Sequence, residues 1–426
     1  MPLRAYLLPK SPAYATALQN DFAEGLPFLP LDATGTNHRT RLILEEARPE
    51  VLVTTVEFAT SLQDLPCTWS ASGEIESGVV YNLEWEAGSR LWPSDLSYIL
   101  YTSGSTGRPK GAMISRSNAQ AFIDWARSAF PLTSEDVVAS IAPFHFDLSV
   151  FDLHASRPAR LWIPPQSAVA NPRMMVGLLA EARVTSMYCT PTFLNALVQY
   201  GKCERHDLSA MRRILFAGEP FQTQDALRAL EAFPQAEFHN LYGPTETNVV
   251  AHWTVDRRTL ESGVCPIGHP VAGATFRLDA SGELCVAGPS VFSGYVDHGI
   301  APPMDEQGAY RTGDRVVQLD NGAYLFEGRI DEMIKRRGYR IEPAEIEAAY
   351  ARFPGMTDCR CLPVEGGKLV LFYRHVEGEL EFEALAGFGL NALPQWMLPD
   401  AYAHVADWPL TASGKTDRKA LQNSYR

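Results

Sequence analysis

Short apolar runs alternate with helical stretches over the first 250 residues of the chain. Runs typical of buried strands lie at residues 51–55, 96–100, 186–189 and 213–217. Helical stretches lie between such runs, for example at residues 118–129 and 223–232. This alternation predicts α/β units with mostly parallel sheets, in which ligands bind at the loops that leave the carboxyl ends of the strands.

The pattern changes twice in the second half of the chain. Residues 265–327 contain short β segments joined by Gly and Pro turns, which is typical of a small barrel or twisted sheet. After residues 328–331 comes a further unit with a helix near 342–350 and a strand near 369–373. About 100 residues suffice for an independent domain. We therefore expect a body over residues 1–330 and a lid over residues 331–426.

Composition narrows the class of protein. The 426 residues are 46% hydrophobic and 20% charged, so the chain is globular and long enough for two or three packed units. The net charge of −13 argues against nucleic acid and anionic membrane as partners. Seven scattered cysteines lack CxxC spacing, and neither a membrane-spanning run nor a leader pattern is evident. We expect a cytoplasmic protein with reduced thiols.

The strand at 96–100 leads into the loop Tyr-Thr-Ser-Gly-Ser-Thr-Gly-Arg-Pro-Lys-Gly at residues 101–111. Its glycines allow tight turns with amides pointing inward, and its hydroxyls and Lys110 add further donors and a positive charge. Polyphosphates need this combination of donors, small bulk and charge. The loop lacks the Gly-Lys-Ser/Thr of the common P-loop. The alternative is a surface linker rich in small polar residues.

Further strings follow this loop in a definite order. They are Ala-Gly-Glu at 217–219, Asn-Leu-Tyr-Gly-Pro-Thr-Glu-Thr at 240–247, Tyr-Arg-Thr-Gly-Asp at 310–314, Gly-Arg-Ile-Asp at 328–331 and Leu-Thr-Ala-Ser-Gly-Lys at 410–415. The order and spacing of all six motifs resemble the adenylate-forming enzymes, which include acyl-CoA synthetases, luciferases and nonribosomal-peptide adenylation domains. The resemblance covers nearly the whole chain. It implies an α/β body of two subdomains plus a small β-barrel-like subdomain, and a mobile α+β C-terminal lid.

The resemblance also implies a reaction in two halves that uses ATP and Mg²⁺. A carboxylate attacks the α-phosphate of ATP, which gives an acyl-AMP and pyrophosphate, and a thiol then displaces AMP. No general base is needed for the first half, because a carboxylate is already ionised at neutral pH.

Site residues are assigned through the same resemblance. Those expected to bind ATP are Thr102, Ser103, Gly104, Ser105, Thr106, Gly107, Lys110, Gly218, Glu219, Pro220, Asn240, Tyr242, Gly243, Asp314 and Arg329. Thr245 is expected at the α-phosphate, and Glu246 is the expected Mg²⁺ ligand because that ion prefers hard carboxylates. Lys415 is expected to reach the carboxylate and α-phosphate as negative charge builds, and Asp331 matches the hinge.

Out of context, several of these residues have simpler interpretations. An isolated Asp314 is usually a turn former, and an isolated Lys415 is usually a surface lysine; the joint pattern favours the functional interpretation. A basic cluster of Lys335, Arg336, Arg337 and Arg340 follows the hinge. This cluster is either a solvated face or a dock for an acidic, phosphopantetheine-bearing carrier protein.

The segment at residues 143–152 carries the substrate clue. In relatives that activate α-amino acids, the aspartate matching Asp147 pairs with the substrate ammonium, and a bound ammonium explains a carboxylate in an apolar pocket. Asp152 is interpreted as structural. The other expected pocket residues are Leu148, Phe151, Tyr188, Leu215, Ala217, Leu241, Val249 and Val250.

This uncharged pocket is similar to that of stand-alone proline adenylation enzymes, which load L-proline on a carrier protein. The resemblance therefore implies an amino acid substrate, L-proline, and a phosphopantetheinylated carrier partner. The alternatives are an acyl-CoA ligase for a small carboxylic acid, against which Asp147 speaks, and a catalytically silent nucleotide-binding homologue. Residues 7–12 match a stretch that relatives reach only after a longer N-terminal segment, so we expect the first family motif to be absent. No carrier segment follows Arg426, so we expect the carrier to act in trans.

Overall fold

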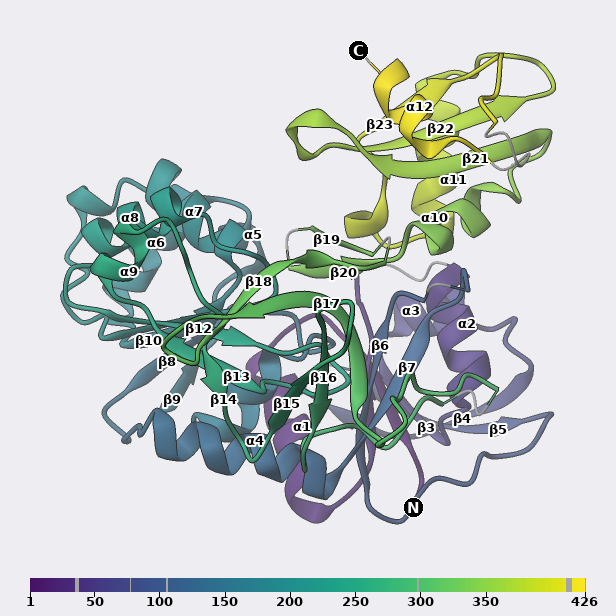
Figure 1. Cartoon of the computed structure of the whole chain (residues 1–426). Coiled ribbons are helices and arrows are strands. Elements are labelled where there is room, and N and C mark those ends of the chain that lie inside the picture. Colours follow the sequence, from purple (N-terminus) through teal and green to yellow (C-terminus); the bar gives the residue numbers. More distant parts are fainter. Residues whose placement is uncertain are drawn as a thin grey trace.

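The computed structural model describes residues 1–34, 38–76, 78–104, 106–296, 299–331, 333–336, 338–410 and 416–425. Two seven-stranded sheets form the bulk of the molecule, and a four-stranded sheet lies beside them (Figure 1). A hairpin and a three-stranded sheet complete the chain. The expected α/β class is confirmed.

The first sheet has the strand order β4-β5-β3-β1-β2-β6-β7. Its strands are β1 (Arg4–Leu7), β2 (Phe28–Pro30), β3 (Val51–Thr54), β4 (Cys67–Ile75), β5 (Gly78–Trp85), β6 (Leu96–Thr102) and β7 (Lys110–Ser115). Strands β3, β1, β2 and β6 are parallel, whereas β4, β5 and β7 join by antiparallel pairing. The accompanying helices are α1 (Pro12–Glu24), α2 (His38–Ala47) and α3 (Val56–Ser61). The turn between β6 and β7 is the Gly- and Ser-rich loop.

The second sheet has the order β14-β13-β12-β11-β10-β8-β9. Its strands are β8 (Val137–Ser140), β9 (Arg160–Trp162), β10 (Ser186–Cys189), β11 (Arg213–Phe216), β12 (Glu237–Tyr242), β13 (Ala251–Thr254) and β14 (His269–Pro270). The run from β9 to β12 is parallel, as the alternating pattern predicts. Its helices are α4 (Arg116–Ala129), α5 (Gln166–Val169), α6 (Pro172–Glu181), α7 (Pro191–Tyr200), α8 (Thr223–Ala232) and α9 (Arg257–Glu261).

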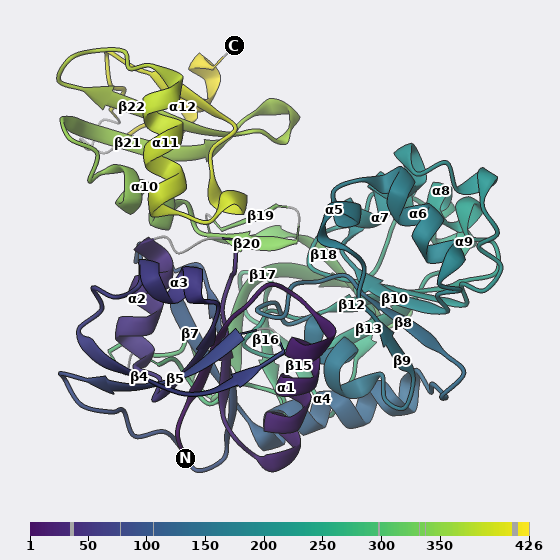
Figure 2. The same cartoon turned by 180° about the vertical axis from the view of Figure 1, so that it is seen from behind.

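The largest hydrophobic core lies where α1, α4 and the two seven-stranded sheets meet. A π-helical turn at Phe151–Ala155 contacts both helices, which lie near each other in Figure 2. The ring of Tyr14 packs edge-on against Phe144, and Phe151 packs edge-on against Tyr188. This core includes Leu148, Val150 and Phe151, and it therefore holds the segment that carries Asp147.

Local sequence explains where the main helices begin and end. The Ser11 hydroxyl accepts the Tyr14 amide at the start of α1, and Gly25 ends that helix in the left-handed region at φ 75°. Ser115 and Asn118 form a reciprocal capping box that starts α4 directly after β7.

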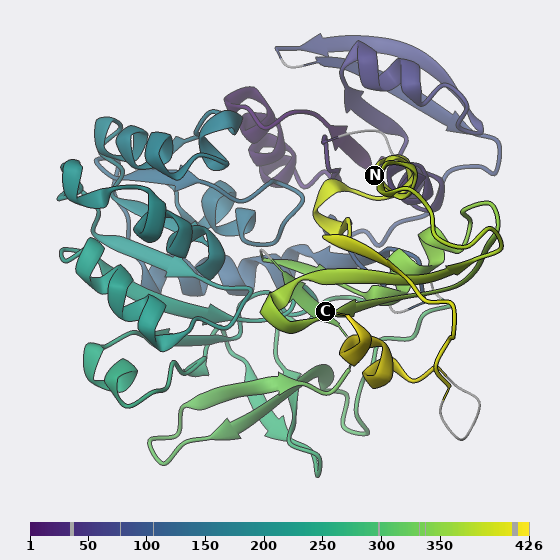
Figure 3. The same ribbon diagram turned by 90° about the horizontal axis from the view of Figure 1, so that it is seen from above.

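The expected small barrel takes the form of an open antiparallel sheet of β15 (Thr275–Leu278), β16 (Glu283–Ala287), β17 (Tyr310–Gln318) and β18 (Tyr324–Arg329). The hairpin β19 (Ile334–Arg336) and β20 (Tyr339–Ile341) then leads to α10 (Pro343–Tyr350), β21 (Met356–Pro363), β22 (Leu369–His375), α11 (Phe382–Ala392), β23 (Ala401–His404) and α12 (Arg418–Ser424). We refer to β20 to α12 as the C-terminal layer. Seen from above, it lies over the region where the sheets of the rest of the molecule meet (Figure 3).

The C-terminal layer has a hydrophobic core of its own, which includes Ile346, Cys361 and Leu371. In the part of the chain that the structure describes, no helix is long and apolar enough to cross a bilayer.

We predict that Leu371→Ala destabilises the C-terminal layer by about 2–5 kcal/mol, because it leaves a cavity in a fully buried site. Leu390→Ala is the matched control in the same layer, since that leucine is 56% exposed; it should change the unfolding free energy by no more than about 0.5 kcal/mol. Urea unfolding followed by fluorescence measures both, and equal effects would contradict the assigned core.

Candidate active site

Two adjoining cavities lie where β10, β11 and β12 end, beneath the β19–β20 hairpin. The larger has a volume of about 270 Å³ and the smaller about 60 Å³. Both are lined by Gly218, Gly243 and Lys335, so they form one continuous site. This position matches the rule that ligands bind at the carboxyl ends of parallel strands.

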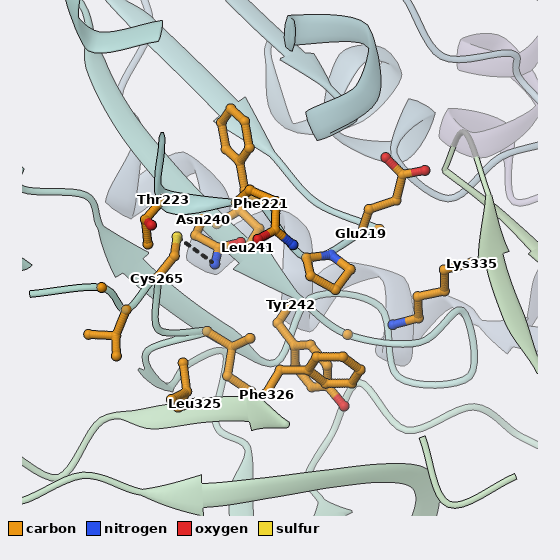
Figure 4. Close-up of a pocket in the computed structure, with 17 residues that line it drawn as sticks. Glu219, Phe221, Thr223, Asn240, Leu241, Tyr242, Cys265, Leu325, Phe326 and Lys335 are labelled. Carbon is orange, nitrogen blue, oxygen red and sulfur yellow. Dashed lines mark hydrogen bonds between the residues drawn. The ribbon is translucent and has the colours of Figure 1, made fainter. Parts of the chain in front are cut away.

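The larger cavity is lined by most of the residues that we expect to bind the adenine of ATP (Figure 4). They are Gly218, Glu219, Pro220, Asn240, Tyr242 and Gly243. The Tyr242 ring lies close to the Phe326 ring in Figure 4, with the Lys335 amine near both. The Asn240 amide donates to the Pro266 carbonyl at 2.7 Å, which sets its orientation beside Cys265. The result is a flat, half-apolar slot that suits an aromatic base.

Asp314 is fully buried at one end of this slot. One carboxylate oxygen accepts the Tyr242 hydroxyl at 2.6 Å and the other accepts Arg329 at 2.7 Å. The Lys335 ammonium is 3.8 Å away. Burial, and then Asp314, raises the pKa of Tyr242, so its hydroxyl stays a donor. If a ribose binds here, its hydroxyls would donate to Asp314 oxygens that also accept Tyr242 and Arg329.

The smaller cavity is bordered by Asp147, the carboxylate expected to pair with the substrate ammonium. Asp147 lines it together with Leu148, Tyr188 and Ala217. The Thr245 hydroxyl donates to Asp147 at 2.8 Å. Among the described residues, no Lys, Arg or His forms an ion pair with this carboxylate. Burial, and to a smaller extent the Glu246 charge, raises the pKa of Asp147, while hydrogen bonds from Thr245 and from the backbone of Leu148 and Asp147 work in the opposite direction. Arg329, Lys335 and Arg340 line the same cavity, but they pair with Asp314, Asp331 and Glu246, so Asp147 is left without an ion-pair partner among the described residues.

The remaining expected pocket residues divide into two groups. Val249 lines the smaller cavity, and Leu241 lines the larger one instead. Phe151, Leu215 and Val250 are buried and line neither cavity. Phe151 supports Tyr188 from behind at a ring distance of 5.8 Å, whereas Val250 packs in the separate cluster that contains Tyr242. Asp152, interpreted as structural, is buried and accepts the Ser140 hydroxyl.

Residues of the C-terminal layer contact the inner donors of the Gly- and Ser-rich loop. Ser103 donates to the Arg340 carbonyl at 2.7 Å and accepts the Glu342 amide at 3.0 Å. The Gly104 amide donates to the Glu345 carboxylate at 3.1 Å. Glu345 therefore provides an anion at an amide that the sequence assigns to a phosphate.

The rest of the loop lies at the edge of the site. The hydroxyl of Thr102 is buried and has no hydrogen-bond partner in the described part of the chain. Lys110 lies 5.7 Å from the Tyr295 ring, and burial, followed by Arg340, lowers its pKa. Thr106 and Gly107 lie outside the two cavities, against α10. Ser105 lies outside the described residues.

Glu246, the expected metal ligand, is completely buried. It accepts the Tyr295 hydroxyl at 2.8 Å and pairs with Arg340 at 3.1 Å. No cluster of three potential ligands is present among the residues that the structure describes. A single carboxylate fits Mg²⁺ that takes its other ligands from phosphates and water. Arg340 neutralises the same carboxylate in this arrangement, so arginine and metal are alternative partners of Glu246.

The expected hinge residue is held by an arginine on the preceding strand. Arg329 donates from Nε to Asp331 at 2.8 Å and from Nη1 to Asp314 and to the Thr312 carbonyl. Burial acts against the charge of Arg329, but Asp331 and Asp314 raise its pKa. Arg329 thus links the expected ribose acceptor to the expected hinge. Lys415 lies outside the described residues.

Glu219 borders the base cavity, and its carboxylate also contacts the β19–β20 hairpin. Its carboxylate accepts the Thr192 hydroxyl at 2.6 Å and the Gly338 amide at 2.6 Å. In Figure 4 its side chain points away from Tyr242. In this arrangement Glu219 anchors the β19–β20 hairpin.

Sequence reasoning placed Lys335 and Arg340 in a surface cluster, but the structure turns both into the site. They are cross-strand partners in the β19–β20 hairpin and therefore share one face of it. Burial lowers the pKa of Lys335, and Asp314 counteracts this. Arg336 points to the other face and pairs with Asp400. Period-two alternation within a short hairpin was the signal that could have separated these side chains.

Comparison with known proteins identifies relatives of the whole chain. The family described as AMP-binding enzyme matches residues 5–296. The chain is 35% identical to an L-proline–[L-prolyl-carrier protein] ligase of Streptomyces coelicolor, covering 98% of this chain and 86% of the relative. It is 32% identical to a ligase of the same name from Pseudomonas fluorescens, with 97% and 87% covered.

Solved structures show the same fold. The amide bond synthetase McbA of Marinactinospora thermotolerans aligns with a TM-score of 0.83 at 20% identity, covering 100% of this chain and 90% of that one. The adenylation domain AlmE of Vibrio cholerae, solved with glycyl-adenosine-5′-phosphate, aligns with a TM-score of 0.82 at 21% identity, covering 99% and 88%.

We predict that Asp147→Asn stabilises the ligand-free protein at neutral pH. The raised pKa of Asp147 means that the native state holds its proton over a pH range in which the unfolded chain has lost it. The unfolding free energy contributed by this group therefore rises as the pH falls from neutrality towards the ordinary range of aspartate. The neutral amide removes the penalty, so the gain in Tm should be larger at pH 7 than at pH 5.

The matched control is Asp207→Asn. Asp207 is exposed, and its hydrogen bond with Ser209 lowers its pKa, so its loss should not raise Tm. Thermal scans at both pH values measure the two variants. A lower Tm for the Asp147 variant at pH 7 would show that the carboxylate is well satisfied by the protein.

Proposed function

The chain belongs to the AMP-binding enzyme family and is an AMP-forming ligase, and we propose that it activates L-proline with ATP. In this proposal the prolyl group then passes to the phosphopantetheine thiol of a separate carrier protein. The observation that carries the proposal is the Asp147 carboxylate, which lines the smaller cavity and forms no ion pair among the described residues. The cations that line the same cavity, Arg329, Lys335 and Arg340, pair instead with Asp314, Asp331 and Glu246.

A substrate ammonium is the partner that this carboxylate needs. Burying an unpaired charge is costly, and an opposite charge within hydrogen-bond distance offsets the cost. The two N–H groups of a protonated pyrrolidine can donate to Asp147, including the oxygen that accepts the Thr245 hydroxyl in the present arrangement. A fatty or aromatic acid offers no such cation, so the carboxylate would weaken its binding.

The size and chemistry of the cavity favour a small hydrocarbon side chain. The space is about 60 Å³, and Tyr188, which Phe151 supports from behind, forms its bulky wall. The residues expected to contact the side chain, Leu148, Tyr188, Ala217 and Val249, are uncharged, and the cations that line the cavity come from β18 and the β19–β20 hairpin. A compact ring fits this shape, and the two proline–carrier protein ligases that cover the whole chain support the same choice.

The reaction then follows from how the two cavities join. A proline carboxylate oxygen forms a bond to the α-phosphorus of ATP, and the bond from phosphorus to the pyrophosphate oxygen breaks. Thr245 has one hydroxyl proton, which goes to Asp147 in the present arrangement; in the proposal the substrate ammonium replaces it there, and Thr245 donates to the α-phosphate. Glu246 would hold Mg²⁺, which when bound offsets phosphate charge. In the second half the carrier thiolate attacks the prolyl carbonyl, and AMP leaves with the electron pair of the C–O bond.

We further propose that residues 1–330 form the body and residues 331–426 a lid that turns at Asp331. In the present arrangement Arg340 and Glu345 contact groups that we assign to Mg²⁺ and phosphate. ATP and this lid position compete for the same partners, so adenylation needs a second position that brings Lys415 to the site. The seven free thiols are consistent with a cytoplasmic enzyme.

The proposed function predicts a preference for one substrate. ATP–pyrophosphate exchange should be stimulated by L-proline more than by any other proteinogenic amino acid, because only its ring fills the short cavity while pairing with Asp147. Valine and alanine should trail by about 10-fold or more, since each misplaced methylene costs about 1–3 kcal/mol. Exchange driven only by small carboxylic acids would establish the CoA-ligase alternative. ATP binding without exchange by any acid would establish a silent homologue.

The second prediction concerns Lys415. Lys415→Ala should reduce proline adenylation by at least about 100-fold, because it removes the cation expected at the developing charge. Transfer from synthetic prolyl-AMP to the carrier should change by less than about threefold, since the lid has then turned away. Lys419→Ala, an exposed lysine on α12, is the control. Equal losses in both half-reactions would rule out a lid with two positions.

A further inference from the structure

A third cavity lies outside the two that form the candidate active site, between α2 and α10. Its volume is about 420 Å³, which is ample for a small ligand. The tip of the Gly- and Ser-rich loop, Thr106 to Pro109, forms one wall. The other walls carry His38 and Arg39 from α2 and Arg352 from the end of α10.

The charges on this cavity are mostly positive. Arg39, Arg108 and Arg352 face one carboxylate, that of Glu345. This cluster of positive charge contrasts with the whole chain, whose net charge is −13. The contact of Arg352 with the ring of His38 does not offset its charge, because the guanidinium and the burial of this ring both lower the pKa of His38 and keep it neutral.

Arg39 is the strongest sign of an anion. Its side chain is 8% exposed, and its Nε donates to Glu345 at 2.8 Å. Its Nη2 is buried and lacks a hydrogen-bond partner within the described residues. Buried guanidinium N–H groups are normally satisfied, so an orphan one on a cavity wall indicates a ligand with acceptor oxygens.

The loop connects this cavity to the phosphate path. One carboxylate oxygen of Glu345 accepts a hydrogen bond from Arg39, and the other accepts one from the Gly104 amide. A Cβ on Gly107 would lie 2.7 Å from Ala348, so α10 is packed directly on the loop tip. In this position, the C-terminal layer forms hydrogen bonds with Ser103 and Gly104 of the loop. The basic cavity lies beside these contacts and stays open.

We propose that this basic cavity is a diphosphate site, which receives the pyrophosphate displaced from the loop when Glu345 occupies the Gly104 amide. The proposal rests on the proposed function, because adenylation is the source of the pyrophosphate. The planar forks of Arg39 and Arg352 match phosphate oxygens, and a compact, multiply charged anion fits a site with three guanidinium groups. Release of pyrophosphate and closure of the C-terminal layer are thereby linked.

Isothermal titration with inorganic pyrophosphate tests the site, using the full chain saturated with AMP. Arg352 is exposed, so Arg352→Gln should fold normally and weaken pyrophosphate binding by about 10-fold or more. Arg39→Gln, at the buried position, should do the same. Arg173→Gln is the matched control for Arg352→Gln, because Arg173 is likewise an exposed arginine and lies on α6, outside this cavity; the affinity of this variant should stay within about twofold of wild type.

Lys110→Ala separates this cavity from the loop's own phosphate site. Binding that survives Lys110→Ala but not Arg352→Gln supports the proposal. Binding that is lost with Lys110→Ala and kept with Arg352→Gln, or no binding to wild type, overturns it. Failure of the proposed function has a different signature: wild type would then bind pyrophosphate at this cavity yet show no amino-acid-dependent ATP–pyrophosphate exchange.

Discussion

A buried aspartate is stabilised by a directly paired cation, and among the described residues Asp147 forms no ion pair. The three cations that line its cavity, Arg329, Lys335 and Arg340, pair with other carboxylates. The Thr245 hydroxyl satisfies one oxygen of Asp147, but a neutral donor offsets only part of the cost of desolvating a carboxylate. The fold maintains this unfavourable position. The π-helical turn that follows Asp147 packs into the largest core, and Tyr188 closes the cavity opposite. In our proposal a substrate ammonium removes this cost, so charge would be the first criterion of substrate choice.

The second constraint is that several site groups have two possible partners. Glu246 pairs with Arg340, the Gly104 amide with Glu345, and Glu219 with Gly338. Every one of these contacts joins the body to the hairpin or the C-terminal layer. They hold that layer over the site while using groups that a nucleotide triphosphate and its metal would need. In our proposal ATP and its metal compete with this interface for the same groups, which would couple the position of the C-terminal layer to the reaction.

Much of this could be predicted from sequence. Short apolar runs located β3, β6, β10 and β11 within two residues, because buried parallel strands are continuously hydrophobic. The hairpin β4–β5 could not be found in this way, since β4 is mostly exposed and has no apolar run. Many of the residues that the motifs predicted for the site line the two adjoining cavities. The motifs could not show that Val249 and Val250 face opposite sides, or that Arg340 pairs with Glu246, because these depend on packing between segments far apart in the chain.

The most direct test of the central claim changes the charge of the substrate and keeps its shape. Tetrahydrofuran-2-carboxylate has the ring and carboxylate of proline, with an oxygen in place of the protonated nitrogen. The kcat/KM for pyrophosphate release should be at least about 100-fold lower for this analogue than for L-proline, a difference of about 2.7 kcal/mol, and Asp147→Asn should remove most of that preference. Equal rates with the two acids, or a preference that survives in Asp147→Asn, would contradict the account.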